Sequence, residues 1–333
     1  MKKFLPLLSI ILLLCSGQMN GQKKIEVLCS ASMLTDIANN IVGDLADVKT
    51  IVPIGGDPHI YEATPRDAQK VRNAQIIFVN GLTFEGWINE LIDNSGTKAK
   101  TYTVTEGIDV IASTQYENSY DPHAWMDVSN AIIYARNMKD AMVENFPASA
   151  NVFEENHKVY EQELKDLHAY VQAQINKIPK EQRILITSHD AFNYYGKEYG
   201  IDVEAIIGIS TEADARTSDV ARVARVIKER KVPAIFVEST INPKLIKQLA
   251  DDNGVPIGGE LYADSLGKPG TEAGTYIGMI KSNTDVIVKA LSSEANQEES
   301  SGIPERESSM MTFIIVGIIL FVLLLFAMIK LRN

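Results

Sequence analysis

The sequence predicts an α/β fold with two lobes, each built around a four-stranded parallel sheet flanked by helices. Short apolar runs typical of strands alternate with helical patterns, and this order is characteristic of parallel sheets. The strand-like runs fall into two sets of four, separated by one long helical segment over 148–178. A chain of 333 residues, of which 45% are hydrophobic, is large enough for two lobes of ordinary size.

The two sets of strands define the elements expected in each lobe. The first set comprises strands near 24–30, 48–54, 75–80 and 100–105, with helices near 32–43, 65–73, 84–94 and 129–145. The second set comprises strands near 183–188, 203–208, 234–239 and 255–259, with helices near 191–199, 214–230, 243–252 and 274–292. The helix near 65 has a complete start signal, because Thr64, Pro65 and Asp67 supply a cap, a first-turn proline and an acid.

The segment over 148–178 is expected to be one long connecting helix. Its apolar residues recur mostly every three or four positions, which is the stripe of an amphipathic helix. Pro147 precedes it and Pro179 follows it, and both are typical of helix boundaries. At about 1.5 Å per residue it would span roughly 45 Å, enough to lie along both lobes. The N-terminal lobe is therefore predicted over 23–147 and the C-terminal lobe over 179–292.

Both ends of the chain carry membrane signals. Residues 1–21 join two lysines to an apolar run, which is typical of a cleavable signal peptide. A polar linker over 293–309 leads to an uninterrupted apolar run over 310–329, long enough for a transmembrane helix. The basic tail at 330–333 is expected in the cytoplasm. The body would therefore lie on the extracytoplasmic, or periplasmic, side, anchored in the cytoplasmic membrane by a C-terminal helix.

Cysteine content and net charge limit the possible membrane anchors, disulfides and binding partners. Lipid attachment at Cys15 is an alternative anchor, although Leu14 stands where a lipoprotein signal has a small residue. Cys29 lies in a predicted strand, and one remaining thiol cannot form an internal disulfide. The net charge of −11 argues against a nucleic-acid partner, because an acidic protein does not neutralise phosphates. It also favours the approach of cations.

Four side chains follow the ends of predicted strands and form a candidate metal site. His59 and His123 come from the first lobe, whereas His189 and Asp264 come from the second. Parallel α/β sheets place their ligands at the carboxyl ends of strands, so the four can meet between the lobes. Imidazole and carboxylate together are a ligand set for transition metals. Both Asp-Pro-His triplets also have a local explanation as rigid turns, and spacing alone leaves the two interpretations open.

Other polar residues carry weaker hypotheses. His157 and His168 lie on the long helix, eleven residues apart, and we interpret both as ordinary surface histidines. Glu238, at the end of a predicted strand, points toward the same cleft and is a candidate acceptor for a ligand imidazole. Three aspartates either play that role or form turns and caps: Asp57, Asp121 and Asp127.

Six segments together resemble the cluster A-I solute-binding proteins of bacterial ABC importers, which bind zinc, manganese or iron. The segments are GGDPHIYEATPRD (55–67), NGLTFEGWINEL (80–91), DPHAWMDVSNA (121–131), TSHDAFNYYGKEYG (187–200), ISTEADARTSDV (209–220) and GGELYADSLG (258–267). The resemblance covers about 25–292 and implies two lobes joined by a long helix. It also implies one metal ion between the lobes, held by the residues that align with His59, His123, His189 and Asp264.

The resemblance leaves the metal open between zinc and manganese, with iron(II) also possible. Some manganese-binding members have a glutamate at the third ligand, where this chain has His189. Zinc-dedicated members often carry a histidine-rich loop before the second histidine, and residues 111–120 contain no histidine. By the Irving–Williams order, three imidazoles and a carboxylate would hold zinc more tightly than manganese.

We therefore expect a non-enzymatic, monomeric receptor that takes part in metal ion homeostasis and delivers its ion to an ABC transporter permease. One alternative is a zinc-dependent hydrolase at the same site, with Asp190 or Glu238 as general base. The sequence contains no HExxH or GxSxG motif to support it. A second alternative is a metal-binding adhesin or sensor.

Overall fold

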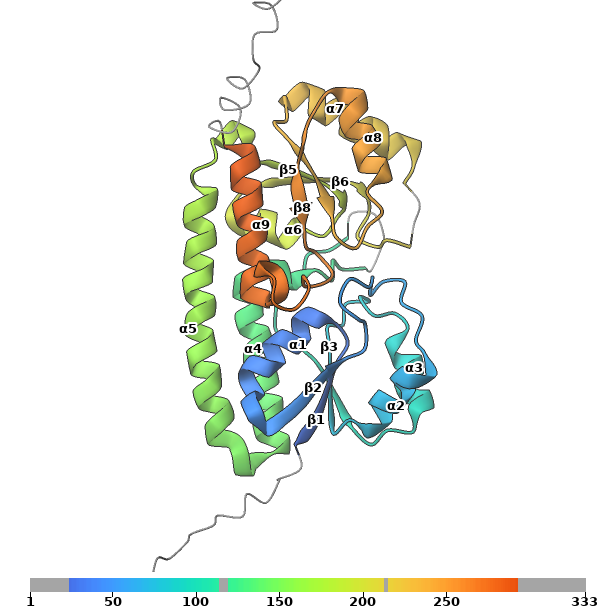
Figure 1. The fold of residues 1–333 in the computed structure, drawn as a ribbon, viewed down its shortest axis with the longest axis vertical. Coiled ribbons are helices and arrows are strands. Elements are labelled where there is room, and N and C mark those ends of the chain that lie inside the picture. Colours follow the sequence, from blue (N-terminus) through green and yellow to red (C-terminus); the bar gives the residue numbers. More distant parts are fainter. Residues whose placement is uncertain (1–23, 114–118, 213–214, 293–333) are drawn as a thin grey trace, which may run out of the picture.

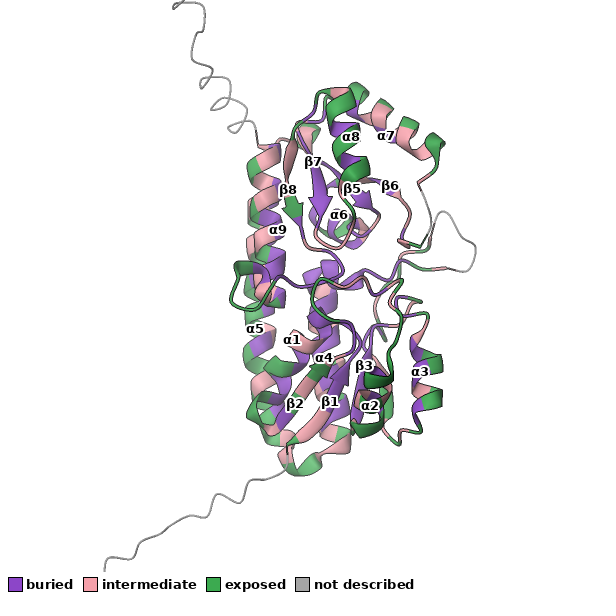
Figure 2. Cartoon of the chain, turned by 45° about the vertical axis from the view of Figure 1, so that its right-hand side comes forward, coloured by how far each residue is buried: buried purple, intermediate pink, exposed green. Residues whose placement is uncertain are grey.

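The computed structural model describes residues 24–113, 119–212 and 215–292, which form two α/β lobes stacked along one long helix (Figure 1). Burial is concentrated in strands such as β3, β5 and β7, whereas exposed positions gather on α3, α7 and α8 (Figure 2). The two lobes are therefore each organised around buried strands with helices outside them.

The N-terminal lobe contains one parallel sheet with the strand order β2-β1-β3-β4. Its strands are β1 (Ile25–Cys29), β2 (Ala46–Thr50), β3 (Ile76–Val79) and β4 (Lys100–Thr103). Its helices are α1 (Ser32–Val42), α2 (Pro65–Asn73), α3 (Ile88–Ser95) and α4 (Val128–Asn145). Successive side chains of β1 alternate between two cores: Val27 packs in the core that contains α1 and α4, and Leu28 packs in the core that contains α2 and α3.

The start of α2 shows how the sequence sets a local boundary. The backbone N–H of Asp67 donates to Thr64 Oγ1 at 3.4 Å, and the backbone N–H of Thr64 donates to Asp67 Oδ2 at 2.9 Å. This reciprocal pair is a capping box, with Pro65 in the first turn. The predicted start of this helix is therefore confirmed.

The C-terminal lobe corrects the prediction of a second four-stranded sheet. Its strands are β5 (Ile184–His189), β6 (Asp202–Ile207), β7 (Ile235–Glu238) and β8 (Ile257–Leu261). They pair in parallel as two two-stranded sheets, β5-β6 and β7-β8. β5 and β7 lie side by side, and the register of β7 on β8 shifts between Ile235 and Phe236. Apolar runs predict strands, but they do not specify which backbone ladders form between them.

Four helices complete this lobe. They are α6 (Asn193–Tyr199), α7 (Thr217–Arg230), α8 (Lys244–Asn253) and α9 (Tyr276–Leu291). Short 3-10 helices occupy Gly43–Leu45, Ala124–Met126, Pro147–Ser149, Lys180–Gln182 and Glu272–Gly274.

The long helix α5 (Ala150–Ile175) runs beside both lobes (Figure 1). It contacts α1 and α4 of the first lobe and α6 and α9 of the second. Its buried residues follow the predicted apolar stripe: Phe153, Tyr160, Leu164, Leu167, Val171 and Ile175. They belong to one hydrophobic cluster with members from both lobes. Separating the lobes would expose part of this shared core, which favours limited movement between them.

The predicted C-terminal transmembrane helix is the second part of the fold prediction that needs correction. Within residues 24–113, 119–212 and 215–292, no helix is both long and apolar enough to cross a membrane. The predicted span at 310–329 lies outside these residues, as do the predicted signal peptide at 1–21, the linker at 293–309 and the tail at 330–333.

Candidate metal centre

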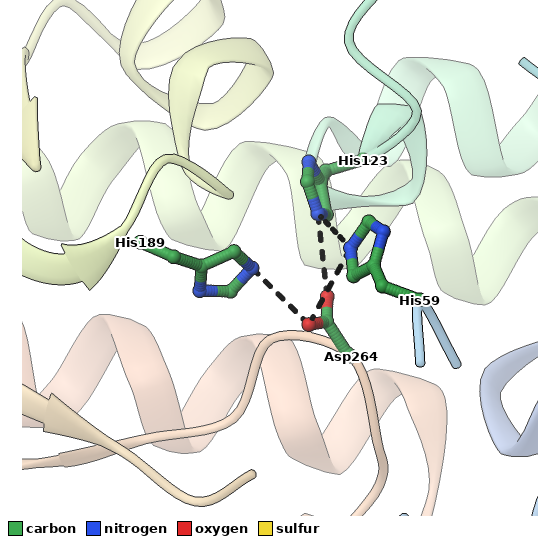
Figure 3. A group of neighbouring side chains, drawn as sticks. All are labelled: His59, His123, His189 and Asp264. Carbon is green, nitrogen blue, oxygen red and sulfur yellow. Dashed lines mark hydrogen bonds and ion pairs between the residues drawn. The ribbon is translucent and has the colours of Figure 1, made fainter. Parts of the chain in front are cut away.

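The structure brings together all four predicted ligands at the junction of the lobes, with their side chains directed toward one another (Figure 3). His59 lies in the loop after β2, and His123 lies between β4 and the short helix Ala124–Met126. His189 is the last residue of β5, and Asp264 follows β8. Each lobe thus contributes two side chains, as the strand-end argument predicts.

The Nε2 atoms of the three histidines surround the carboxylate of Asp264. Its oxygens lie 3.1 Å from His189 Nε2, 3.4 Å from His123 Nε2 and 3.9 Å from His59 Nε2. The Nε2 atoms of His59 and His123 are 3.2 Å apart, and one ligand atom from each of the four residues lies within 4.8 Å of the others. Ligands bound to zinc at about 2.0–2.2 Å stand roughly 3.3–3.6 Å apart in a tetrahedron, so the spacing fits one ion.

Two of the imidazoles are held by carboxylates on the side away from Asp264. His123 Nδ1 lies 2.7 Å from Asp121 Oδ1, which also accepts the backbone N–H of His123 at 2.9 Å. His189 Nδ1 lies 2.6 Å from Glu238 Oε2, and the backbone N–H of His189 donates to Glu238 Oε1 at 2.9 Å. Each carboxylate favours a proton on Nδ1 and leaves Nε2 available to a metal.

The other two aspartates near the histidines form local structure, the alternative role considered for them. Asp57 accepts the backbone N–H of His59 at 2.9 Å and the hydroxyl of Thr211 at 2.6 Å, so it shapes the His59 loop and ties it to the other lobe. Asp127 caps α4 by accepting the backbone N–H of Ser129 at 2.7 Å.

The electrostatics of the cluster favour an ionised carboxylate and at least one neutral imidazole. Burial alone would raise the pKa of Asp264, but His189, His123 and His59 together lower it. Burial lowers the pKa of His59 to about 3. Burial would also lower the pKa of His189, but Glu238 and Asp264 raise it well above its ordinary value. A metal ion bound at His189 would therefore compete with a proton on its ring.

The carboxylate of Asp264 is buried and has only imidazoles as its polar neighbours in the described part of the chain. Its oxygens lie 3.1–3.9 Å from the Nε2 atoms of the three histidines, and neither accepts a further hydrogen bond there. Burying a carboxylate without stronger compensation is costly. A cation shared with the three histidines would satisfy both oxygens, which makes the group suited to a metal.

We did not predict a role for Glu85 from the sequence, although this residue holds the loop that packs beside His59. This buried carboxylate accepts the backbone N–H groups of Asn80 at 2.7 Å and Gly81 at 3.1 Å, and it also accepts the Ser30 hydroxyl. The loop that it holds carries Phe84, whose ring centroid lies 5.0 Å from that of His59. An acid in the loop that follows a buried strand, beside the aromatic residue Phe84, was the available signal.

A two-lobed α/β fold with a buried His/Asp ligand set at the lobe junction defines a metal-binding solute receptor. Residues 27–290 match the family described as the periplasmic component A of the zinc-uptake complex. The chain belongs to this family, which confirms the resemblance seen in the sequence.

Individual relatives agree with this assignment. The chain is 36% identical over 277 residues to the manganese-binding lipoprotein MntA of Halalkalibacterium halodurans, covering 83% of this chain and 92% of that protein. It is 35% identical over 294 residues to the manganese ABC transporter substrate-binding lipoprotein PsaA of Streptococcus pneumoniae, covering 85% and 95%. The periplasmic zinc-binding protein TroA from Treponema pallidum has a similar structure, with a TM-score of 0.77, 35% identity and coverage of 81% and 99%.

These comparisons bear on the choice between receptor and enzyme. The relatives are named as metal-binding or substrate-binding proteins, which agrees with a non-enzymatic receptor. The hydrolase alternative gains no support from them. The geometry adds a reason, because both oxygens of Glu238 face His189 instead of being free to act as a base.

Proposed function

We propose that this chain is the extracytoplasmic receptor of an ABC importer and binds one divalent transition metal between its lobes. The ligands are His59, His123, His189 and Asp264. The observation that carries the proposal is their convergence, two from each lobe, around one buried carboxylate. Contributions from both lobes couple metal binding to the relative position of the lobes.

Zinc and manganese are the leading candidates for the bound ion, and iron(II) is the third. The donor set favours zinc in affinity, whereas MntA and PsaA are named for manganese and TroA for zinc. Affinity and cellular supply together determine which ion occupies such a site.

The proposed partner is the permease of the same transporter, because PsaA is named as the substrate-binding protein of an ABC transporter. MntA and PsaA are also named as lipoproteins. We propose membrane attachment through a lipid, with Cys15 at the end of the N-terminal apolar run as the modified residue. Incorporation of labelled fatty acid that is lost in Cys15→Ala would support this anchor, and incorporation that persists in the variant would contradict it.

Metal titration of the stripped full chain tests the binding proposal. Zinc and manganese are titrated separately into the wild type, His59→Ala and His157→Ala, the last being a matched control on α5 that belongs to neither group of candidate ligands. We expect one tightly bound ion in the wild type and in the control, and much weaker binding in His59→Ala. Equal affinity in all three proteins would contradict the ligand set. Normal growth of a deletion strain at limiting metal would contradict the importer role.

A further inference from the structure

A second group of potential metal ligands lies outside the inter-lobe site. Asp127, His168 and Glu198 each offer one ligand atom, and these atoms lie within 4.8 Å of one another. We call this group the outer cluster. Asp127 precedes α4, His168 lies on α5 and Glu198 lies on α6. The cluster therefore joins a helix of each lobe to the long connecting helix.

The imidazole of His168 has one nitrogen beside Tyr199 and the other directed toward Glu198. Its Nδ1 lies 3.3 Å from the hydroxyl of Tyr199, and the two ring centroids are 5.5 Å apart. Tyr199 is itself fixed, because its hydroxyl accepts the backbone N–H of Val128 at the start of α4. The other ring nitrogen, Nε2, lies 3.7 Å from Glu198 Oε1. A partner on one nitrogen that orients the second toward a metal is the usual arrangement of ligand histidines.

The charges in the outer cluster also favour a cation. Ligand atoms of Asp127 and Glu198 lie within 4.8 Å of one another beside a single imidazole, so a cation would offset the repulsion between the two carboxylates. Asp127 uses Oδ1 to cap α4. A carboxylate offers about four acceptor positions, so the cap leaves it able to bind an ion.

One side chain of the outer cluster is buried, and the other two are partly exposed to solvent. Asp127 is buried, whereas the side chains of His168 and Glu198 are 33% and 37% exposed. An ion can therefore reach the group from solvent while one ligand is held inside the protein. Water can complete the coordination, as it does where a protein supplies three ligands to zinc.

We propose that the outer cluster is a second site for a divalent transition metal, best matched to zinc by its one nitrogen and two oxygen ligands. The inference goes beyond the proposed transport function, because none of these residues belongs to the inter-lobe ligand set. An ion here would crosslink α4, α5 and α6 and stiffen the junction between the lobes. It binds more weakly than the inter-lobe ion, because it has fewer protein ligands and is open to water.

Zinc stoichiometry of the full chain tests this proposal. The protein is dialysed against rising free zinc, and bound zinc is measured by elemental analysis. We expect two equivalents in the wild type, the second filling at higher zinc. His168→Gln and Glu198→Gln should each keep the first equivalent and lose the second. His157→Gln, a histidine on the same helix outside the cluster, should keep both.

Three results would overturn the proposal. The wild type binding only one equivalent would exclude a second site. A second equivalent that persists in both His168→Gln and Glu198→Gln would place that ion elsewhere, and loss of both equivalents would show that the residues do not act separately from the inter-lobe site. Because Glu198 lies on the surface, Glu198→Gln keeps the test decisive even if His168→Gln folds poorly.

Discussion

The inter-lobe cluster and the outer cluster use the same residue types in opposite arrangements. At the lobe junction, three imidazoles surround one buried carboxylate, and two of the rings are held by Asp121 and Glu238. In the outer cluster, one imidazole lies near two carboxylates, and two of the three side chains are partly exposed. We infer from this difference that the metal affinity of a ligand set depends on burial and on the groups that orient it, and not on residue type alone.

The two clusters also differ in where the chain supplies their residues. The inter-lobe ligands stand at or after strand ends, where an α/β sheet concentrates functional residues. The outer cluster is made by the start of one helix and the faces of two others. The inter-lobe arrangement suits an ion that binds to both lobes, whereas the arrangement of the outer cluster suits an ion that crosslinks helices.

Removal of the Asp264 carboxylate should have the largest effect on the first cluster. Asp264→Ala removes the one anionic group among the four candidate ligands. Loss of a group that only orients a ligand lowers metal affinity about 10–100-fold, so we expect loss of a ligand itself to lower zinc affinity by more than about 100-fold, measured by competition with a chelator. Glu260→Ala, an exposed acid on β8, is the control and should bind normally. An Asp264→Ala protein with wild-type affinity would remove the central role given to this carboxylate.

Weakening the support of His189 should have the next largest effect. Glu238→Gln keeps the size of the side chain but removes the charge that orients the imidazole. Loss of such a supporting partner typically reduces metal affinity about 10–100-fold. The same change at Glu198 should leave the first equivalent of zinc unaffected, so the pair of variants separates the two clusters. Identical first-ion affinities in Glu238→Gln and the wild type would contradict the supporting role.

Acidification should weaken metal binding at the inter-lobe cluster. Although burial opposes it, Glu238 and Asp264 raise the pKa of His189, so the metal-free site retains a proton there. The metal and this proton compete, and affinity must therefore fall as the pH falls. One competing proton corresponds to about a tenfold loss per pH unit. Titrations at pH 8 and pH 6 in buffers of different ionisation enthalpy would measure both affinity and proton release. A constant affinity across this interval would show that no proton is displaced.

Loss of a helix cap that belongs to neither cluster should lower the stability of the protein without changing metal binding, and it should have the smallest effect. Thr275 accepts the backbone N–H of Gly278 at 3.1 Å at the start of α9. Thr275→Ala should lower the free energy of unfolding by about 1 kcal/mol, measured by urea denaturation. Neither cluster loses a ligand, so both zinc equivalents should remain. A change in zinc stoichiometry would mean that the clusters depend on α9 more than their direct contacts indicate.

The inter-lobe ligands were predictable because local patterns identify strand ends and a parallel sheet brings those ends together. His189 is the clearest example, because it ends a fully buried apolar run. The orienting role of Asp121 was proposed but not distinguished from turn formation. Only the three-dimensional position of its carboxylate beside His123 Nδ1 separates the two roles.

The remaining features depend on contacts that no local pattern records. His168 was interpreted as an ordinary surface histidine because its own helix offers no carboxylate near it, whereas its partners come from the start of α4 and from α6. The prediction of one sheet in the C-terminal lobe rests on four strand-like runs that alternate with helices. Whether neighbouring strands share a ladder is decided by backbone register, which these apolar runs do not specify.

Anomalous diffraction from crystals of the zinc-loaded protein would locate the bound ion. We expect a strong zinc peak among His59, His123, His189 and Asp264, with each ligand atom about 2.0–2.2 Å from the ion. At high zinc we expect a weaker peak among the residues of the outer cluster. A strong peak anywhere else, with the four inter-lobe side chains left without an ion, would show that these four residues are not the metal site.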